Sequence, residues 1–420
     1  MYLHGELLGS LSDRTVGFVG FDFDEAAIVR HGIGSRVLSL SMPVSWDSVD
    51  PFIATAFFSG LLPEGEARQR LTEEFQVSPD DPYGLLELIG RESAGALVIV
   101  PSGKQPPSEA EASVRVLDER ALAAELGRLT LTPLGVTVDD DEIRLSLAGV
   151  QNKLPLVVVV DDDDDALGLP LNGHPSTHIA KPSPTGERGE RFPCLVENEA
   201  FCLAAVAELG IPTARFRILD VSGENVLLVE RYDRFREDGR IRRLHQEDAC
   251  QAAAINPAFK YESGGGPSLV TVTSLIADHS SQPGRDRIVL FRLTVANLLF
   301  GNCDAHGKNI SFLHTEEGVR LAPAYDVVST QAYPHTDRLG MRIDGVERLR
   351  DVDRGAVLAQ AGVMGLPPRL ASGQLAEMAE RLPASIDAAR TRAQQEGWHV
   401  EVIERIAADV ATRCEQICGE

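Results

Sequence analysis

Apolar and polar residues alternate in short runs through the first hundred positions, which is typical of mixed strands and helices. The pattern predicts strands at 1–9, 16–23, 36–40 and 96–100, and helices at 51–58, 64–74 and 83–88. A stretch rich in proline, serine and glycine follows at 101–109 and marks a predicted boundary.

From Val114 onward the pattern favours strands, at 143–147, 154–160, 177–180, 216–221 and 225–229. After Asp233 strands become scarce apart from one hairpin, and helical periodicity continues to the end. The predicted fold class is therefore α+β, with a β-rich lobe, a helical lobe and a nucleotide in the cleft between them. We expect three parts, at 1–103, 104–232 and 233–420.

A polar loop stands out between an apolar helix predicted at 285–300 and a hairpin predicted at 309–314 and 319–322. Residues 301–309 of this loop read Gly-Asn-Cys-Asp-Ala-His-Gly-Lys-Asn, and Asp326 lies 17 residues beyond Asn309. Phosphoryl transfer needs a carboxylate that orients and deprotonates the attacking hydroxyl, and oxygen ligands that hold Mg²⁺ on the nucleotide. Asp304, Asn309 and Asp326 supply these groups, although one Asp-x4-Asn by itself is more commonly a polar turn.

Two lysines in the β-rich part are candidates for binding phosphate. The turn 146–153, Ser-Leu-Ala-Gly-Val-Gln-Asn-Lys, can present backbone N–H groups and Lys153 to phosphate oxygens, or it can be an ordinary hairpin turn. Lys181 ends an apolar strand before a proline and can reach α- and β-phosphates if a carboxylate fixes it. Glu199, at the start of the helical run to Leu209, is the preferred partner and Glu197 the second choice. Alternatively, Lys181 is a charge on an edge strand and Glu199 favours the helix N-terminus.

Composition limits the possible classes of function. The net charge of −23, from 40 basic and 63 acidic residues, argues against a general nucleic-acid footprint. The six cysteines show no zinc spacing and are expected to be reduced thiols. No signal sequence begins the chain, and apolar runs such as 154–160 are too short to span a membrane, so we expect a cytoplasmic protein.

Several motifs in the same order resemble the HipA-type serine/threonine kinases, the toxin halves of bacterial toxin–antitoxin pairs. The resemblance covers nearly the whole chain. The matching segments are 61–66 with 93–97 in the N-terminal subdomain, then 146–153, 178–181, 230–234, 302–309 and 325–326. It implies that 1–103 is the HipA-like N-terminal subdomain, 104–232 the kinase N-lobe and 233–420 the helical C-lobe.

The resemblance also implies roles within the loop. Asp304 would be the catalytic base, with His306 and Lys308 contacting phosphate or stabilising the loop. Asn309 and Asp326 would hold Mg²⁺.

The nucleotide, ATP, would be held by the β-rich part. The resemblance implies that Lys153 and Lys181 bind its phosphates and that Glu230 and Tyr232 hold adenine, where many relatives have phenylalanine at the position of Tyr232. Without the other motifs, Glu230 and Tyr232 would be only a charged strand end. The residues expected to form the phosphate-binding loop are Ser146, Gly149, Gln151 and Lys153. Ser146 would also be an autophosphorylation site, because a phosphate there adds about −2 charge where nucleotide phosphates must sit.

The implied partners are a protein substrate and an antitoxin. The substrate would be a translation component such as an aminoacyl-tRNA synthetase, and the antitoxin a HipB-like helix-turn-helix protein through which nucleic acid is reached only indirectly. Two other classes stay open: a small-molecule phosphotransferase with a similar Asp-x4-Asn layout, and a nucleotide-binding regulator without turnover. The N-terminal hundred residues argue against the first, and the complete set of acidic and basic residues argues against the second.

Two features lie outside the resemblance. Five aspartates at 161–165 lack the spacing of a calcium loop and are interpreted as a solvated, mobile hairpin tip. Three glycines at 264–266, after Lys260-Tyr261-Glu262, are interpreted as a flexible loop near the cleft. Such a loop could help to admit a protein substrate, but flexibility alone is the preferred interpretation.

Overall fold

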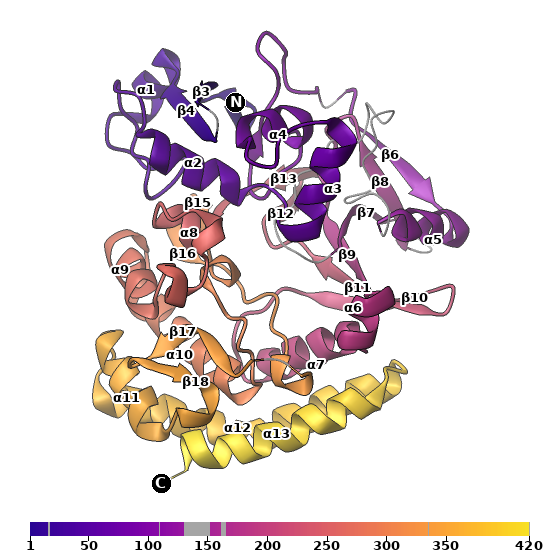
Figure 1. Ribbon diagram of the computed structural model, residues 1–420, viewed down its shortest axis with the longest axis vertical. Coiled ribbons are helices and arrows are strands. Elements are labelled where there is room, and N and C mark those ends of the chain that lie inside the picture. Colours follow the sequence, from indigo (N-terminus) through magenta and orange to yellow (C-terminus); the bar gives the residue numbers. More distant parts are fainter. Residues whose placement is uncertain (16, 109, 130–151, 161–164, 335, 420) are drawn as a thin grey trace. The chain divides into compact units, whose positions relative to one another are not determined.

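The computed structural model describes residues 1–15, 17–108, 110–129, 152–160, 165–334 and 336–419 (Figure 1). These residues form two compact units, and each is considered by itself. Unit 1 comprises Met1–Pro182, Leu219–Ala258 and Leu313–Thr315; unit 2 comprises Ser183–Ile218, Phe259–Phe312 and Glu316–Glu420.

Unit 1 begins with small antiparallel sheets and four helices. The strands β1, β2 and β5 form one sheet in the order β2-β1-β5, and β3 pairs with β4. The bounds are β1 (Tyr2–Leu3), β2 (Glu6–Leu7), β3 (Gly9–Thr15), β4 (Phe18–Phe23), α1 (Glu25–His31), α2 (Pro51–Gly60), α3 (Gly65–Phe75), α4 (Pro82–Ile89) and β5 (Leu97–Val98). Helix α2 begins where its sequence suggests, because Pro51 occupies the first turn and the Asp50 carboxylate accepts the Phe52 N–H at 2.8 Å.

The centre of unit 1 is a six-stranded sheet in the order β10-β11-β9-β7-β8-β6. The pairs β6/β8, β7/β8, β7/β9 and β9/β11 are antiparallel. The remaining bounds in this region are β6 (Ser113–Leu117), α5 (Glu119–Arg128), β7 (Leu154–Val160), β8 (Asp165–Leu171), β9 (His178–Pro182), β10 (Phe216–Val221), β11 (Glu224–Glu230), β12 (Arg234–Glu237), β13 (Arg240–Arg243), β14 (His245–Asp248) and α8 (Ala249–Ala252). The division between the units passes through β10.

One hydrophobic core joins the N-terminal elements of unit 1 to the six-stranded sheet. Phe21, Phe57 and Phe58 are fully buried in it, and so are Ala180 and Leu228 of the sheet. The N-terminal hundred residues and the sheet therefore share their buried surface.

Unit 2 is mostly helical. Its bounds are α6 (Gly186–Arg191), α7 (Leu195–Glu208), α9 (Leu269–His279), α10 (Pro283–Leu299), β16 (Gly318–Leu321), β17 (Arg338–Ile343), β18 (Val346–Arg348), α11 (Arg354–Val363), α12 (Pro368–Gln395) and α13 (Val400–Cys418), with β15 (Ser311–Thr315) crossed by the division between the units. Short 3₁₀ helices lie at Glu262–Gly264, Gly307–Asn309, Thr330–Ala332 and Leu349–Asp351, and another, Pro257–Phe259, is crossed by the division between the units.

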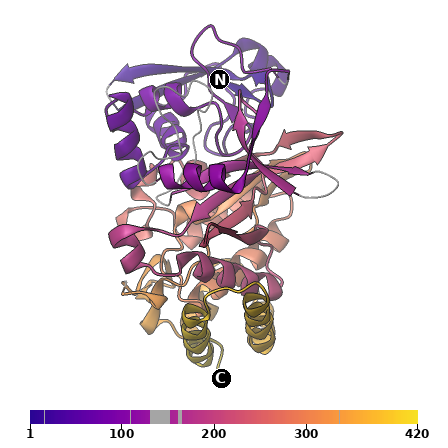
Figure 2. The same cartoon turned by 90° about the vertical axis from the view of Figure 1, so that its right-hand side faces the viewer.

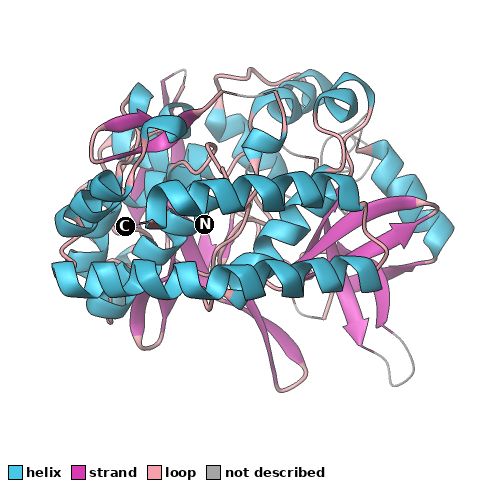
Figure 3. Ribbon diagram, turned by 90° about the horizontal axis from the view of Figure 1, so that it is seen from below, coloured by secondary structure: helices cyan, strands magenta, loops and turns pink. Residues whose placement is uncertain are grey.

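Helix α10 is the central helix of unit 2. It contacts α9, α12 and α13, and α12 and α13 also contact α7. Figure 2 shows α12 and α13 end-on, and Figure 3 shows them side by side along their length. Leu290, Phe291, Val295, Ala296 and Leu299 of α10 are all buried, as expected for a helix with neighbours on several sides.

The predicted helices are confirmed with small shifts in their ends. Residues 51–58, 64–74, 83–88 and 285–300 correspond to α2, α3, α4 and α10, and the predicted hairpin corresponds to β15 and β16. The strands 154–160, 177–180, 216–221 and 225–229 are β7, β9, β10 and β11. The strand predicted at 143–147 lies outside the described residues.

The strand predicted at 36–40 is wrong, because this segment bonds to a carboxylate instead of to a neighbouring strand. The Glu247 side chain accepts the Ser39 hydroxyl at 2.5 Å and the Leu40 N–H at 2.8 Å. The only ladder contact of the segment is an isolated bridge from Ser39 to Met42, in the part of the chain that the structure describes.

The prediction that strands become scarce after Asp233 is also wrong, and helix α5 was not predicted. The hairpin β12–β13 consists largely of arginines and glutamates, with Arg234 opposite Arg243, so its pattern does not look like that of a buried strand. Helix α5 is marked by Asp118, whose carboxylate accepts the Ala121 N–H at 2.7 Å, and by the buried residues Leu122 and Leu126 at a spacing of four.

The aspartate run at 161–165 joins two strands that pair antiparallel, with Val160 opposite Asp165, as a hairpin requires. Residues 161–164 themselves lie outside the described residues.

Candidate functional site

The predicted catalytic loop begins where α10 ends. Gly301 has φ of +67°, a left-handed conformation that glycine adopts without a Cβ penalty and that commonly ends a helix. Its carbonyl accepts the Thr330 N–H at 3.1 Å and the Thr330 hydroxyl at 3.0 Å, while the same hydroxyl oxygen accepts the Cys303 N–H at 3.0 Å. The start of the loop is therefore fixed to the segment around Thr330.

Asp304 is held through its backbone and its side chain. Its N–H donates to Asn302 Oδ1 at 3.1 Å, and Asn302 is fixed in turn by a bond from its amide to Asn297 Oδ1 at 3.0 Å. The Asp304 carboxylate is half-buried, and its Oδ1 accepts the Tyr261 hydroxyl at 2.5 Å. The predicted base is thus a partly accessible carboxylate in a fixed orientation.

The loop closes in a single 3₁₀ turn that carries three predicted residues. The Asn309 N–H donates to the His306 carbonyl at 2.9 Å, and the His306 N–H donates to Asn309 Oδ1 at 3.2 Å. His306 and Lys308 are buried, whereas Asn309 is half-buried. Burial of His306 and Lys308 favours the prediction that they stabilise the loop.

Tyr325 brings the segment of Asp326 to this turn. Its hydroxyl donates to the Lys308 carbonyl at 2.6 Å, and it lies 2.6 Å from Ser311 Oγ. Asp326 is half-buried and has φ of +51°, which is uncommon for a residue other than glycine and often marks a functional position. Asp304, Asn309 and Asp326 therefore belong to one hydrogen-bonded region of unit 2, and their roles stay predictions.

Helix α7 supports the chain just after Asp326. The Asn198 side chain donates to the Ser329 carbonyl at 3.0 Å and accepts the Ser329 N–H at 2.8 Å. Glu197 and Glu199, on either side of Asn198, are also buried. Glu199 lies in unit 2 and Lys181 in unit 1, so the predicted pairing of these two residues stays a prediction.

The predicted nucleotide-binding residues of unit 1 lie in or beside the six-stranded sheet. Lys153 and Lys181 are 8% and 6% exposed. Lys181 lies on β9, opposite Leu227 of β11. Because β9 is an interior strand of the sheet, Lys181 is not a charge on an edge strand. Glu230 ends β11, and the Tyr232 hydroxyl just beyond it donates to Gln246 Oε1 at 2.6 Å.

Ser146, Gly149 and Gln151, three of the predicted phosphate-loop residues, lie outside the described residues. Lys153 is the described member of that set.

A buried ionic cluster beside Tyr232 was not predicted. Glu92 contacts Arg231, Arg234 and Arg243, and Asp233 accepts bonds from Arg231 and from the Gly95 N–H. Burial raises the pKa of Glu92, but the three guanidinium groups outweigh this effect and lower the pKa to about 2. Burial likewise raises the pKa of Asp233, but Arg231 and Arg234 lower this pKa by more, so the net shift is downward. Both carboxylates are therefore ionised and fix the segment that leads to the predicted adenine contacts.

The thiol in the predicted catalytic loop is not a candidate nucleophile. Cys303 is 2% exposed, and burial raises the pKa of its thiol to about 11. All six cysteines lie within the described residues and are free thiols, as predicted. At neutral pH the protonated form of Cys303 dominates, whereas a reactive cysteine needs the thiolate.

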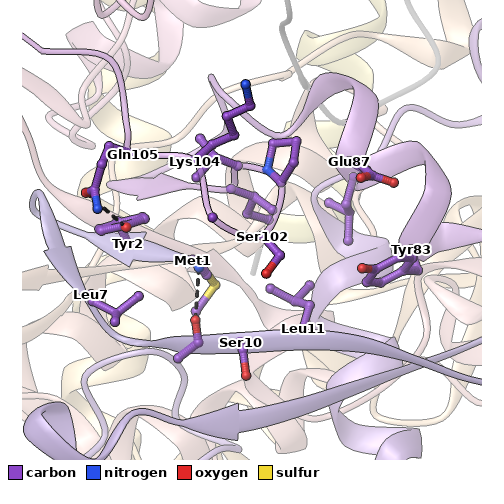
Figure 4. A pocket seen from close by; sticks show the side chains of 16 residues that line it. Met1, Tyr2, Leu7, Ser10, Leu11, Tyr83, Glu87, Ser102, Lys104 and Gln105 are labelled. Atoms are coloured by element: carbon purple, nitrogen blue, oxygen red, sulfur yellow. Dashed lines mark hydrogen bonds between the residues drawn. The ribbon is translucent and has the colours of Figure 1, made fainter.

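The pocket in Figure 4 lies in the N-terminal part of unit 1, with a volume of about 290 Å³. The Met1 ammonium donates to the Gly9 carbonyl at 2.9 Å there, and the Tyr2 hydroxyl bonds to Gln105 at 3.2 Å. Its other lining side chains include Tyr83, Glu87 and Lys104, and none of the predicted site residues is among its lining residues.

Two further findings hold for the described residues. They contain no group of three or more His, Cys, Asp or Glu side chains that could hold a metal ion. Nor is any of their helices both long and apolar enough to cross a membrane.

Comparisons with known proteins agree over most of the chain. The family model of the HipA N-terminal domain matches residues 1–100, and that of the HipA-like C-terminal domain matches residues 145–386. The serine/threonine-protein kinase toxin HipA of Shewanella oneidensis is 31% identical over 394 residues, which cover 90% of this chain and 87% of that protein. The Sinorhizobium fredii protein Y4mE, named a kinase only provisionally, is 36% identical over 372 residues, covering 86% of this chain and 85% of that protein.

A solved structure extends the similarity to the fold. A chain in the Shewanella oneidensis complex of HipA, HipB and operator DNA matches with a TM-score of 0.79 and 26% identity, covering 99% of this chain and 96% of that chain. The predicted α+β, HipA-like fold class is confirmed.

Proposed function

Because the chain belongs to the HipA family and is a serine/threonine protein kinase that uses ATP, we propose that Asp304 orients and deprotonates the acceptor hydroxyl. The observation that carries this proposal is the geometry of Asp304. Its carboxylate is half-buried, and Tyr261 and Asn302 hold its side chain and its backbone. A base on a fixed loop can meet the acceptor hydroxyl in one orientation, which a phosphoryl transfer between two positioned oxygens requires.

Asn309 and Asp326 fit a magnesium ion. They offer amide and carboxylate oxygens, which Mg²⁺ prefers, and Tyr325 ties the Asp326 segment to the turn of Asn309. Mg²⁺ is usually held by one or two carboxylates together with nucleotide phosphates, so a cluster of three acidic side chains is not needed. When bound, Mg²⁺ would offset charge on the transferring phosphoryl group.

Lys153 and Lys181 are proposed to bind the nucleotide phosphates, with Glu199 as the partner of Lys181. Lys153 directly precedes β7 and Lys181 lies near the end of β9, and a lysine ammonium group can bind phosphate oxygens. Glu230 and Tyr232 are proposed to hold adenine, a role that the rigid ionic cluster beside them supports. Ser146, Gly149 and Gln151 complete the proposed phosphate loop, with Ser146 as the autophosphorylation site.

The biological role that these features support is that of a toxin with a protein substrate. The relative from Shewanella oneidensis is named a toxin, and the similar solved chain is part of a complex with HipB and operator DNA. We therefore infer a HipB-like helix-turn-helix antitoxin as partner, with DNA reached through that partner. A translation component such as an aminoacyl-tRNA synthetase is the proposed substrate.

The test compares Asp304→Asn with Asp278→Asn, which removes the same charge from an exposed position on α9. Each protein is incubated with γ-labelled ATP and a heat-treated cell lysate. We expect wild type and Asp278→Asn to label protein, and Asp304→Asn to lose activity by about 10²–10⁴-fold with unchanged ATP binding. Mass spectrometry of the same samples should find phosphate on Ser146 only where Asp304 is intact.

Three outcomes would contradict the proposal. Labelled metabolites in place of labelled protein would indicate a small-molecule phosphotransferase. Label transfer by Asp304→Asn at the wild-type rate would remove Asp304 as the base. Phosphate at another residue, with Ser146 unmodified, would remove the autophosphorylation site.

A further inference from the structure

Tyr261 is bonded to the side chain of the proposed base. Its hydroxyl donates to Asp304 Oδ1 at 2.5 Å across 43 residues of sequence, the short distance expected of a bond to a carboxylate. The Tyr261 ring meets the ring of His306 edge-on, with centroids 5.0 Å apart and an interplanar angle of 83°. The hydroxyl and the ring thus contact two residues of the same loop.

The backbone around Tyr261 is tied to the same region of unit 2. The Gly307 N–H donates to the Lys260 carbonyl at 3.1 Å, which joins the catalytic loop to the residue before Tyr261. The Glu262 carboxylate accepts the Arg342 N–H at 2.6 Å, which fixes the residue after it. Tyr261 is therefore held from both sides, although its side chain is 38% exposed.

The three glycines that follow form a tight turn, so the flexible loop predicted from the sequence is not what the structure shows. The Tyr261 carbonyl accepts the N–H groups of Gly264 at 2.9 Å and Gly266 at 3.0 Å. Gly265 has φ of +93°, and a Cβ on Gly266 would lie 2.1 Å from the Phe259 carbonyl oxygen. Only glycine fits at Gly266, because the chain returns there directly against the backbone that carries Tyr261.

We propose that Tyr261 is a positioning residue for Asp304, an inference that rests on the proposed function of Asp304. The Tyr261 hydroxyl fixes Oδ1, and Oδ2 makes no hydrogen bond among the described residues. Oδ2 is then the oxygen that meets the acceptor hydroxyl. In the transfer the acceptor proton goes to Oδ2, the acceptor oxygen bonds to the γ-phosphorus, and ADP leaves; Tyr261 keeps its proton throughout.

The glycine turn at 264–266 contributes to the same positioning of Asp304. The turn fixes the position of the Tyr261 backbone relative to the loop of Asp304. A residue larger than glycine at Gly266 therefore displaces the Tyr261 hydroxyl from Asp304. A displacement of about 1 Å in a catalytic group can cost about 10²-fold in rate. The glycine turn therefore acts on catalysis through Tyr261.

The first experiment uses Tyr261→Phe in the full chain, since phenylalanine keeps the ring contact with His306 and removes only the hydroxyl. We expect kcat for label transfer from γ-labelled ATP to lysate protein to fall by about 10- to 100-fold. KM for ATP and the Tm should stay at their wild-type values. Tyr2→Phe is the matched control, because it removes the hydroxyl of an exposed hydrogen bond to Gln105.

A double-mutant cycle separates positioning from a general structural role. In an Asp304→Asn background the residual rate should not fall further when Tyr261→Phe is added, because both changes act through one carboxylate. Gly266→Ala should reproduce the loss in kcat, whereas Gly264→Ala should not, since a Cβ at Gly264 meets nothing within 4 Å.

The outcomes distinguish this inference from the proposed function. If Asp304→Asn is inactive and Tyr261→Phe has wild-type kcat, Tyr261 does not position the base, although Asp304 keeps its role. A higher kcat in Tyr261→Phe would also overturn the inference, because the hydroxyl would then block the acceptor. If Asp304→Asn is active, the proposed function itself fails.

Discussion

Glu92 and Asp304 show how differently two carboxylates can be used in one chain. Glu92 is 1% exposed and its charge is compensated by three arginines, so it contributes to stability. Asp304 is half-buried and bonds through one oxygen only among the described residues, so it can meet a substrate. At the scale of the residue, compensation of charge distinguishes the structural role of Glu92 from the proposed catalytic role of Asp304.

Replacing Glu92 by Gln should destabilise unit 1 strongly. The change leaves three arginines facing a neutral side chain, and breaking a buried ion pair costs about 3–5 kcal/mol. Glu237→Gln is the matched control, because Glu237 pairs with Arg242 on the surface, where a pair contributes at most about 1 kcal/mol. Denaturant unfolding should show a large loss for the first variant and little change for the second; equal losses would contradict a special role for Glu92.

The stability that Glu92 contributes should depend on pH in a defined window. Its pKa is about 2 in the folded protein and ordinarily 4.5, so the folded state binds its proton more weakly than the unfolded state. The contribution is therefore complete above about pH 4.5 and is lost as pH falls toward about 2. Unfolding free energies measured from about pH 6 to about pH 3.5 should fall more steeply for wild type than for Glu92→Gln, and parallel curves would argue against a lowered pKa.

At the scale of the element, the end of α10 decides where the proposed catalytic loop starts. Local signals predicted this helix, since an apolar stretch at 285–300 ends at Gly301, and the structure adds Pro283 as its first residue. The same kind of signal failed for β12 and β13, whose residues are mostly exposed and whose Arg234 and Arg243 contact Glu92. It failed for 36–40 because Glu247, some 200 residues away, takes its N–H and hydroxyl groups.

Gly301→Ala should destabilise the protein and slow catalysis. The left-handed conformation costs a residue with a Cβ about 1–2 kcal/mol, and the new Cβ would lie 3.0 Å from Arg413 Cζ. Gly362→Ala in α11 is the control, for which we expect a gain in stability. Its Cβ meets nothing within 4 Å, and alanine stabilises a helix relative to glycine by about 1 kcal/mol. Thermal unfolding should give a lower Tm for the first and a higher Tm for the second; a Tm at or above wild type for Gly301→Ala would contradict this account of the helix end.

At the scale of the whole molecule, the protein is a strongly acidic chain. A net charge of −23 repels a free nucleotide, so binding has to rely on local lysines and a divalent ion. Lys153 and Lys181 of unit 1 are the lysines proposed for this role, and Asn309 and Asp326 of unit 2 are the proposed ligands of the ion.

A non-hydrolysable ATP analogue should stabilise the protein only when Mg²⁺ is present. Ligand at 100 times its Kd adds about 2.7 kcal/mol of stability, which raises the Tm. Asp326→Asn should lose the Mg²⁺-dependent part of this rise. Asp344→Asn should keep it, because Asp344 is exposed and has a similar left-handed φ of 48° but no proposed ligand role. A full rise for Asp326→Asn in Mg²⁺ would remove Asp326 as a metal ligand.

The sequence by itself determined the main helices, the polar loop after α10 and the order of motifs that identifies the family. These follow from local periodicity, capping residues and spacing, which act over a few turns of chain. Only the tertiary structure decided that Glu92 neutralises arginines more than 130 residues away and that Tyr261 bonds to Asp304. Periodicity indicates which face of an element is buried, but it does not indicate which distant side chain covers that face. In this protein the distant side chains determine the charge state of Glu92 and the orientation of Asp304, the proposed base.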